Sequence, residues 1–264
     1  SRPIQGIMYH GWGSLTDTAS HGSYRYTHPD TKNELRRLAH EVVVPLGPTL
    51  RQIPNRSADV AMLESFASEM FAGRGTYGWN GSWAGDMYLI LLYAGLQPDI
   101  LFEESIQKNG LDKYKVLVLP DCDVLPESIV MAVQTFQEAG GIVVGDERLC
   151  PAITPAIQVQ THSRPKEADV ARQMNQEKAA VLRDQLSTRY QWYACASTPD
   201  IIPHVRSYNT TDYLFAVNDL REFGNYVGHH GLVMENGVPT DAVLSIARNG
   251  YVYDLLNGRQ IDNS

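Results

Sequence analysis

The chain has 264 residues, of which 43% are hydrophobic and 20% are charged, and its formal net charge is −8 at pH 7. This length and composition suit a globular protein with one large or two small domains, each with its own core. The acidic balance argues against nucleic acid as a partner, because binding a phosphate backbone needs a basic surface. The 14 tyrosines and 4 tryptophans favour carbohydrate or protein partners instead.

Membrane, metal and cofactor binding are not expected. The longest strongly apolar run, residues 87–96, is too short for a membrane-spanning helix, which needs ~20 residues. Cys122, Cys150 and Cys195 lie far apart without a CxxC pair, so we expect neither a disulfide framework nor a zinc site. The first residues carry no apolar signal segment and no initiator methionine, which indicates a processed or truncated chain and leaves the cellular compartment open.

Residues 1–56 read as one strand and one helix. The strand is expected at 4–10 and the helix at 33–44, with Thr31 as its N-cap and Glu34 completing a capping box. Two prolines follow and are expected to end the helix. A single strand and helix cannot bury an apolar face by themselves, so this segment is expected to be the tail of a preceding domain.

Residues 57–198 are expected to form an α/β domain with a mainly parallel sheet. Strands are predicted at 58–63 and 99–102, and a helix that is apolar on all sides is predicted between them at 87–94. A long loop rich in glycine and aromatic residues precedes that helix. Because strands and helices keep alternating to residue 144, the pattern favours a doubly wound sheet.

Residues 113–147 carry the clearest pattern of the chain. Residues 116–119 form a continuous apolar run, which is typical of a strand buried on both faces. Pro126 suits the first turn of a helix, and two glycines end that helix before a strand at 142–144. The buried stripe expected of the helix consists of Ile129, Val133 and Phe136.

The remaining chain reads as a link, a long helix and a small β domain. Residues 151–160 are expected to be irregular and 166–186 helical. The apolar stripe expected of that helix is Val170, Met174, Val181 and Leu182. Residues 199–264 alternate with period two and predict a small antiparallel β-sandwich. Its strands are expected at 201–207, 212–218, 242–247 and 251–255, with Asn–Gly turns at 236–237, 249–250 and 257–258.

Cys122 follows a predicted strand in the segment PDCDVLP and is therefore a candidate nucleophile. Asp121 and Asp123 flank it, and neighbouring carboxylates raise the pKa of a thiol. The order of elements resembles the class I glutamine amidotransferase-like fold, a flavodoxin-like arrangement whose nucleophilic cysteine lies on a sharp turn after a strand. In the matching segment, GGIVVGDE, that position falls at about Glu147. The resemblance therefore implies a sheet retained for structure, without its nucleophile.

A second resemblance involves longer segments. The residues VAMLES at 60–65 and YKVLVLPDCDVLPESIVMAVQTFQEAGGIVVGDER at 114–148 resemble the middle domain of β-galactosidases of glycoside hydrolase family forty-two. In that family, an amidotransferase-like domain without a nucleophile follows a TIM barrel and mediates trimerisation, and a small β-sandwich follows it. ARNGYVYDLLNGRQI at 247–261 is similar to the terminal hairpin of such a sandwich, and GIMYHGWGS at 6–14 fits the last barrel strand and its loop. The glycine-rich loop departs from the family pattern.

Two aromatic groups are the candidate substrate-binding residues. The first lies at the end of the proposed barrel strand, where barrel enzymes keep their sites, and the second lies in the glycine-rich loop. These residues are Tyr9, His10 and Trp12 in the first group, and Tyr77, Trp79 and Trp83 in the second. For the first group, sugar stacking by Trp12 and packing at a domain junction remain open. For the second, an oligomer contact, sugar contact and internal packing remain open.

Other polar residues are weaker candidates. His229 and His230 are adjacent and would point to opposite faces of a strand, so a shared metal ion is not expected. Glu64 and Glu69 follow a strand and could line a crevice or lie in solvent.

The sequence therefore predicts a non-catalytic region of a longer glycoside hydrolase. Its segments are 1–56 as the tail of a barrel, 57–198 as an amidotransferase-like domain and 199–264 as a β-sandwich. The region would serve structure, homo-oligomer formation or completion of a carbohydrate site. Two alternatives stay open: an independent cysteine hydrolase that uses Cys122 or Cys150, and a sugar-binding module.

Overall fold

The computed structural model describes residues 29–72, 83–227 and 232–261, and the chain divides into two compact units. The sheet unit comprises Ser57–Pro203 with Ala242–Ser245. The second unit takes the segment up to Arg56 together with His204–Asp241 and Ile246–Ser264. One boundary lies between Arg56 and Ser57, where the sequence places the start of the α/β domain. The division into three segments stays a prediction.

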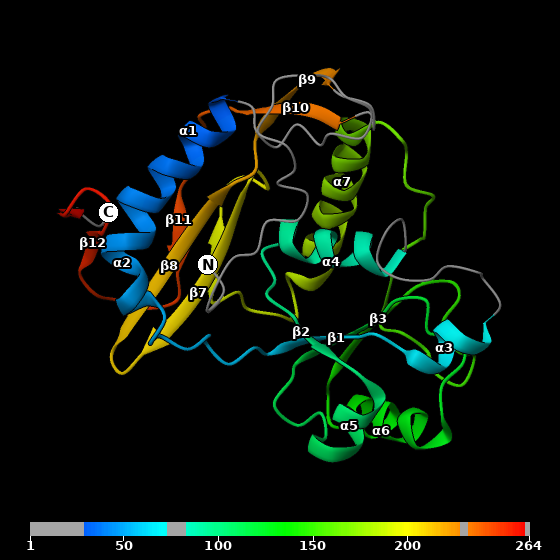
Figure 1. Ribbon diagram of the computed structural model, residues 1–264. Coiled ribbons are helices and arrows are strands. Elements are labelled where there is room, and N and C mark those ends of the chain that lie inside the picture. Colours follow the sequence, from blue (N-terminus) through cyan, green and yellow to red (C-terminus); the bar gives the residue numbers. More distant parts are fainter. Residues whose placement is uncertain (1–28, 73–82, 228–231, 262–264) are drawn as a thin grey trace. The chain divides into compact units, whose positions relative to one another are not determined.

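The sheet unit contains five parallel strands in the order β2-β1-β3-β4-β5 (Figure 1). This is the order of flavodoxin-type doubly wound sheets, so the predicted fold class is confirmed. All residues of β1, β3 and β4 are buried, which explains their continuous apolar runs. The five strands are β1 Val60–Leu63, β2 Asp99–Leu101, β3 Val116–Leu119, β4 Ile142–Gly145 and β5 Ile157–Gln158.

Helices cover both faces of this sheet (Figure 1). Side chains that alternate along the strands divide between two apolar clusters: Met62 and Val118 pack with α4 and α7, whereas Leu117 packs with α5 and α6. The four helices are α4 Trp83–Tyr93, α7 Ala168–Leu186, α5 Glu103–Asn109 and α6 Glu127–Glu138. In the described part of the chain, no helix has the length and apolar character needed to cross a membrane.

The β3–α6–β4 segment matches its prediction closely. Pro126 is the N-cap of α6, and the predicted stripe of Ile129, Val133 and Phe136 is buried. Gly141 is needed at the end of the helix because a Cβ there would lie 2.4 Å from the Phe136 ring. The backbone that leads from α6 into β4 therefore packs closely against the Phe136 ring.

The helical segment near the N-terminus is longer than predicted. α1 Pro29–Leu38 begins before Thr31, so Thr31 is not its N-cap, and the helix continues through a π-helical turn, Ala39–Val43, into α2 Val44–Leu50. The two expected stops, Pro45 and Pro48, lie inside it. Pro45 follows the π-helical turn, in which Val44 N donates to Ala39 O, so the hydrogen-bond pattern of the helix changes next to the proline.

The segment expected to be an irregular link contributes a strand. Ala156 N donates to Val143 O over 2.8 Å and Val159 N donates to Gly145 O over 2.9 Å, so β5 extends the sheet beside β4. A strand of two residues has too few positions for a sequence period to reveal it.

The loop rich in aromatic residues is also more ordered than predicted at its two ends. Phe66–Phe71 form helix α3, and α4 begins at Trp83, before its predicted start. Residues 73–82 lie outside the described part of the chain.

The buried stripe of α7 differs from the predicted one. Val170 and Val181 are 42% and 58% exposed, whereas Leu182 was correctly placed in the core. The stripe that packs on α4 and the sheet is Asn175, Ala179, Leu182 and Leu186. The prediction failed because a buried asparagine and alanine replace large apolar residues on this face.

After α7, the described strands form small two-stranded sheets. β6 Ala194–Ala196 pairs with β11 Leu244–Ile246, and the other three pairs are formed by neighbouring strands. Those pairs are β7 Ile201–Tyr208 with β8 Thr211–Asn218, β9 Arg221–Val227 with β10 Leu232–Gly237, and β12 Val252–Asp254 with β13 Arg259–Ile261. Of the three predicted Asn–Gly turns, the one at 257–258 joins β12 and β13, with Gly258 at φ 62°. Residues 236–237 instead end β10, and 249–250 join strands that do not pair with each other.

A buried arginine ties the helical segment to the strands of the second unit. Arg206 is 2% exposed and its Nη2 donates to the carbonyl oxygens of Leu50 and Ile53, at the end of α2. Burial lowers the pKa of Arg206. The carbonyl end of a helix is a favourable site for a cation, and this offsets part of the cost of burying it.

Replacing Leu182 by Ala tests the observed stripe of α7. We expect the free energy of unfolding to fall by about 2–5 kcal/mol, because the substitution leaves a cavity in the core. The neighbouring Val181→Ala variant is the control, and we expect it to stay within about 0.5 kcal/mol of the parent protein because Val181 is exposed. Urea unfolding followed by circular dichroism measures both. Equal losses in the two variants would contradict this packing.

Candidate functional site

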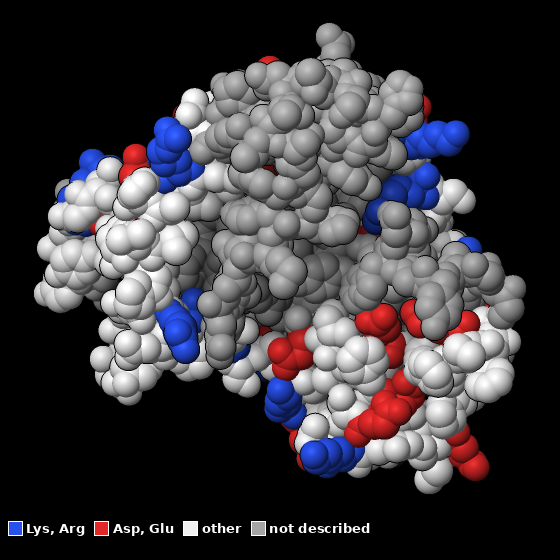
Figure 2. Space-filling view, viewed as in Figure 1, with Lys and Arg blue, Asp and Glu red and all other residues white. Residues whose placement is uncertain are grey.

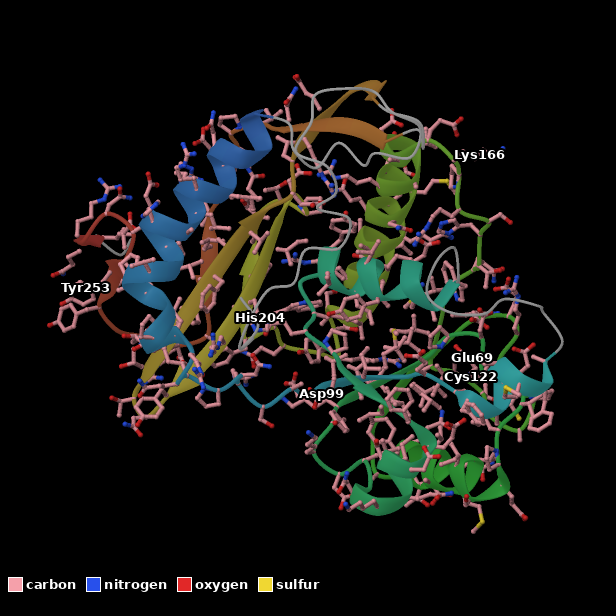
Figure 3. The ribbon with its side chains drawn as sticks, viewed as in Figure 1. Glu69, Asp99, Cys122, Lys166, His204 and Tyr253 are labelled. Atoms are coloured by element: carbon pink, nitrogen blue, oxygen red, sulfur yellow. The ribbon has the colours of Figure 1, made fainter. Side chains whose placement is uncertain are left out.

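Polar side chains gather where the parallel strands end. In doubly wound sheets, ligands bind outside the carboxyl ends of the strands, at the point where the strand order reverses, which here lies between β1 and β3. Figure 3 shows Cys122 and Glu69 near this edge and Asp99 at the opposite end of the strands. The described residues of this edge form three hydrogen-bonded clusters.

Asp146 is the centre of the first cluster. Its carboxylate is 4% exposed and accepts hydrogen bonds from Trp83 Nε1 at 2.8 Å, Asp121 N at 2.7 Å and Arg148 N at 2.9 Å. Burial raises the pKa of Asp146, and these three donors act in the opposite direction. One side chain therefore joins the turn after β4 to the turn after β3 and to the first residue of α4.

Glu147 occupies the position that the amidotransferase resemblance assigns to a nucleophile. Its carboxylate accepts from the backbone N of Thr161 at 3.0 Å and from the Thr161 hydroxyl. Burial by itself would raise the pKa of Glu147, but the donors of Thr161 outweigh it and hold that pKa below its usual value. Glu147 thus anchors the segment that follows β5, and this contact gives Glu147 a structural role.

The turn after β3 does not activate the thiol of Cys122. The side chain is fully buried, and its Sγ lies 3.3 Å from Pro120 O. Burial raises the pKa of Cys122 well above its ordinary value, and the charges of Asp146 and Glu103 raise it further. Because the thiolate is the nucleophile, this environment opposes nucleophilic chemistry, as the flanking carboxylates predicted.

Asp121, the residue before Cys122, has an unusual backbone conformation. Asp121 has a φ of 53°, in the left-handed region that few residues other than glycine adopt. Its carboxylate accepts from Arg148 Nη1 at 2.7 Å, and its own N–H is held by Asp146. The turn after β4 therefore holds the turn after β3 through both backbone and side chain.

Glu103 is the centre of the second cluster. Its buried carboxylate accepts from Ser65 Oγ at 2.7 Å, from Phe66 N at 3.1 Å and from Ala67 N at 3.2 Å. Ser65 also accepts from Ser68 N, at 3.1 Å, as the N-cap of α3. A carboxylate at the start of a helix satisfies its free N–H groups and matches its dipole.

Asp86 is the centre of the third cluster. Its side chain is 1% exposed and accepts from Arg164 Nε at 2.8 Å and from Asn175 Nδ2 at 3.3 Å. His162 Nε2 lies 3.8 Å from the Asp86 carboxylate, and the His162 ring meets the Trp83 ring edge-on at 5.3 Å. Burial lowers the pKa of His162, and the charge of Asp86 acts in the opposite direction.

Most of the predicted binding residues lie outside the described part of the chain. These are Tyr9, His10, Trp12, Tyr77 and Trp79, together with His229 and His230. Trp83 is described: it is 5% exposed, and its ring and Nε1 are used in internal packing, one of the three roles left open for it. Glu64 is half-buried, and burial, followed by the charge of Glu69, raises its pKa.

The sequence did not single out the three carboxylates that organise this edge. Asp146 stands directly after a buried strand, and this position was a usable signal. Asp86 and Glu103 lie in the first turns of helices, where an acidic residue is common for reasons of the helix dipole alone. Within the described residues, no group of three or more His, Cys, Asp or Glu side chains could hold a metal ion.

Comparison with known proteins finds likeness at the level of structure. No protein-family profile and no curated protein matches the sequence. The GH42 β-galactosidase Gan42B from G. stearothermophilus superposes with a TM-score of 0.54 at 14% identity, over 98% of this chain and 45% of that enzyme. The β-galactosidase from Rahnella sp. R3 gives 0.54 at 12% identity, over 93% and 48%, and that from Bacillus circulans sp. alkalophilus gives 0.51 at 14%, over 89% and 46%.

These likenesses establish a shared fold. The chain has the fold of part of these GH42 enzymes, as the sequence resemblance predicted, and it spans less than half of the length of each.

Replacing Asp146 by Asn tests its role as the link between the turns. An amide would direct an NH2 group at one of the present N–H donors, and an unsatisfied buried donor costs about 1–3 kcal/mol of stability. We expect a loss of this size in urea unfolding at neutral pH. Asp112→Asn, at an exposed carboxylate in the loop after α5, is the control and is expected to change little. The proposed link is wrong if the two variants are equally stable.

Proposed function

We propose that this chain is a non-catalytic region of a longer glycoside hydrolase-like protein. The proposal rests on one observation above all: its fold matches part of GH42 β-galactosidases over 98% of the chain, while covering 45% of the enzyme. In this proposal the chain is the C-terminal region, and it stabilises the longer protein or completes a carbohydrate site whose reacting groups lie elsewhere.

The chemistry of the described carboxylates supports this role. Hydrolysis of a glycosidic bond uses two carboxyl groups that flank the bond, one as acid and the other as base or nucleophile. At the carboxyl edge of the sheet, Asp86, Glu103 and Asp146 are buried and each accepts hydrogen bonds from several protein donors. Groups held in this way stabilise the fold and are shielded from a substrate, so we place the catalytic pair outside this chain.

The two alternatives are weaker on the described geometry. A cysteine hydrolase that uses Cys122 needs an accessible thiolate there, whereas Cys122 is buried with a raised pKa. The same role for Cys150, which is less buried, is tested by the labelling experiment below. A sugar-binding module built on the aromatic loop would have to rely on Tyr77 and Trp79, since the ring of Trp83 packs internally.

Homo-oligomer formation is part of the proposal through the family resemblance. Light scattering of the longer protein tests it, and a strict monomer would contradict this part of the proposal.

Thiol reactivity separates the scaffold from a cysteine hydrolase. We expect Cys122 in the folded protein to resist iodoacetamide at pH 7–8, around the pKa of about 8.5 of a free cysteine, and to react at the ordinary rate in urea. Site-resolved mass spectrometry measures the rate for each cysteine. Cys195, which is less buried, serves as the internal reference. Labelling of native Cys122 or Cys150 faster than a free cysteine would favour the hydrolase.

Activity assays of the longer protein test two claims separately: that it is a glycosidase, and that this chain completes its sugar-binding site. We expect it to hydrolyse an aryl β-galactoside, and we expect Trp12→Ala and Trp79→Ala to raise KM about tenfold, equivalent to ~1.4 kcal/mol of lost aromatic contact. Tyr251→Ala, at a residue 82% exposed, is the control. Lack of any glycosidase activity contradicts the parent enzyme, whereas activity with unchanged KM contradicts only the completion of the sugar site.

A further inference from the structure

Helix α3, with the turns beside it, exposes an unusual set of apolar side chains. Phe66, Met70 and Phe71 are 60%, 52% and 75% exposed, and Phe102 and Val124 on adjacent turns are 47% and 38% exposed. These five residues are called the α3 apolar face. Contiguous exposed apolar side chains of this kind mark interaction surfaces, because isolated exposed residues are common but clusters are not.

Buried hydrogen bonds hold this face in place. Glu103 accepts from the backbone of Phe66, so the residue after Phe102 is fixed to the first turn of α3. On the other side, Ser68 Oγ donates to Val124 O at 2.7 Å and accepts from Val124 N at 3.1 Å. The three segments of the face are therefore clamped together by buried polar groups. An exposed apolar surface on a rigid support loses little conformational entropy when a partner binds.

Carboxylates lie on the segments that carry the α3 apolar face, next to its apolar residues in the chain. Glu69 lies on α3 between the exposed apolar residues, and the other carboxylates belong to the ends of β1 and β3 and to the first turns of α5 and α6. These are Glu64, Asp123, Glu104 and Glu127. The pKa of Glu64 is raised by burial and then by the charge of Glu69, which shows that the two carboxylates influence each other. Figure 2 shows acidic side chains gathered around uncharged ones over this part of the sheet unit.

The acidic rim, made of the carboxylates next to the α3 apolar face, indicates which kind of partner would bind there. If two copies of this chain met through the same face, each acidic rim would oppose the other, and like charges across an interface are destabilising. A chain with a formal net charge of −8 adds to that repulsion. A partner with basic residues around an apolar anchor would gain from both features, because apolar contact supplies affinity and opposite charges supply orientation and a faster association.

We propose that the α3 apolar face docks a basic amphipathic helix of a partner protein. Aromatic or aliphatic side chains of the partner cover Phe66, Met70 and Phe71, and its lysine or arginine side chains meet the rim at Glu69 and Glu104. This inference does not depend on the glycoside hydrolase proposal, because it uses only the exposure, the clamping and the charge of this face.

Binding of a designed peptide tests the proposal. The probe is a fluorescein-labelled peptide of about 14 residues, roughly four helical turns, with leucine on one stripe and lysine elsewhere. A matched peptide carries glutamate in place of lysine. We expect fluorescence anisotropy to show saturable binding of the lysine peptide only, weakened at least fivefold between about 0.05 and 0.5 M NaCl because salt screens the rim.

Variants of the chain locate the binding site. We expect Phe71→Ser and Met70→Ser each to weaken binding about tenfold, and the double variant Glu69→Gln, Glu104→Gln to weaken it several-fold and reduce its salt dependence. Val181→Ser, at an exposed valine on α7, is the matched control and is expected to bind like the parent chain. Urea unfolding checks that each variant is folded.

Three results would overturn the proposal. The first is absence of saturable binding, or equal binding of the glutamate peptide. The second is binding that Phe71→Ser and Met70→Ser leave unchanged while both variants are folded. The third is an oligomer in light scattering that Phe71→Ser dissociates, which would assign the face to a second copy of the chain.

Discussion

The carboxylate of Asp146 is the contact on which the carboxyl edge of the sheet depends. It accepts hydrogen bonds from the start of α4, from the turn after β3 and from its own turn, and the donor on Trp83 is buried. Its neighbour Glu147 adds the segment that leaves β5. Two adjacent acidic residues thus determine how four segments meet at the end of the strands.

The described acidic residues of this edge, and the thiol beside them, make internal contacts. In the related architecture with a nucleophile, the turn after the strand presents a reactive side chain to a crevice. Here the same turn presents hydrogen-bond acceptors to the protein itself, and the nearby Cys122 thiol is buried among carboxylates that oppose its ionisation. Among the described residues, Asp86, Glu103 and Asp146 are buried in internal hydrogen bonds, whereas α3 exposes apolar side chains.

Sequence patterns predicted the elements whose type and burial are visible in their own residues. β3, α6 and β4 were predicted closely because apolar runs, a proline at the helix start and glycines at its end all agree. The stripe of α7 was predicted wrongly because Asn175 and Ala179 are buried there, and Asn175 is buried for a partner, Asp86, that is 89 residues away in the chain. The helix through Pro45 was missed because proline usually ends a helix, and the π-helical turn that precedes it here has no local sequence signal.

The sequence by itself determined the doubly wound class of the sheet and the burial of its central strands. These follow from local periodicity and residue identity, which need no knowledge of distant contacts. Only the tertiary structure decided which carboxylates organise the edge, that Trp83 packs inside, and that α3 carries apolar side chains outside. The packing of Trp83, for example, depends on its hydrogen bond to Asp146. These two residues are far apart in the chain, and the crossover connections of the sheet bring them together.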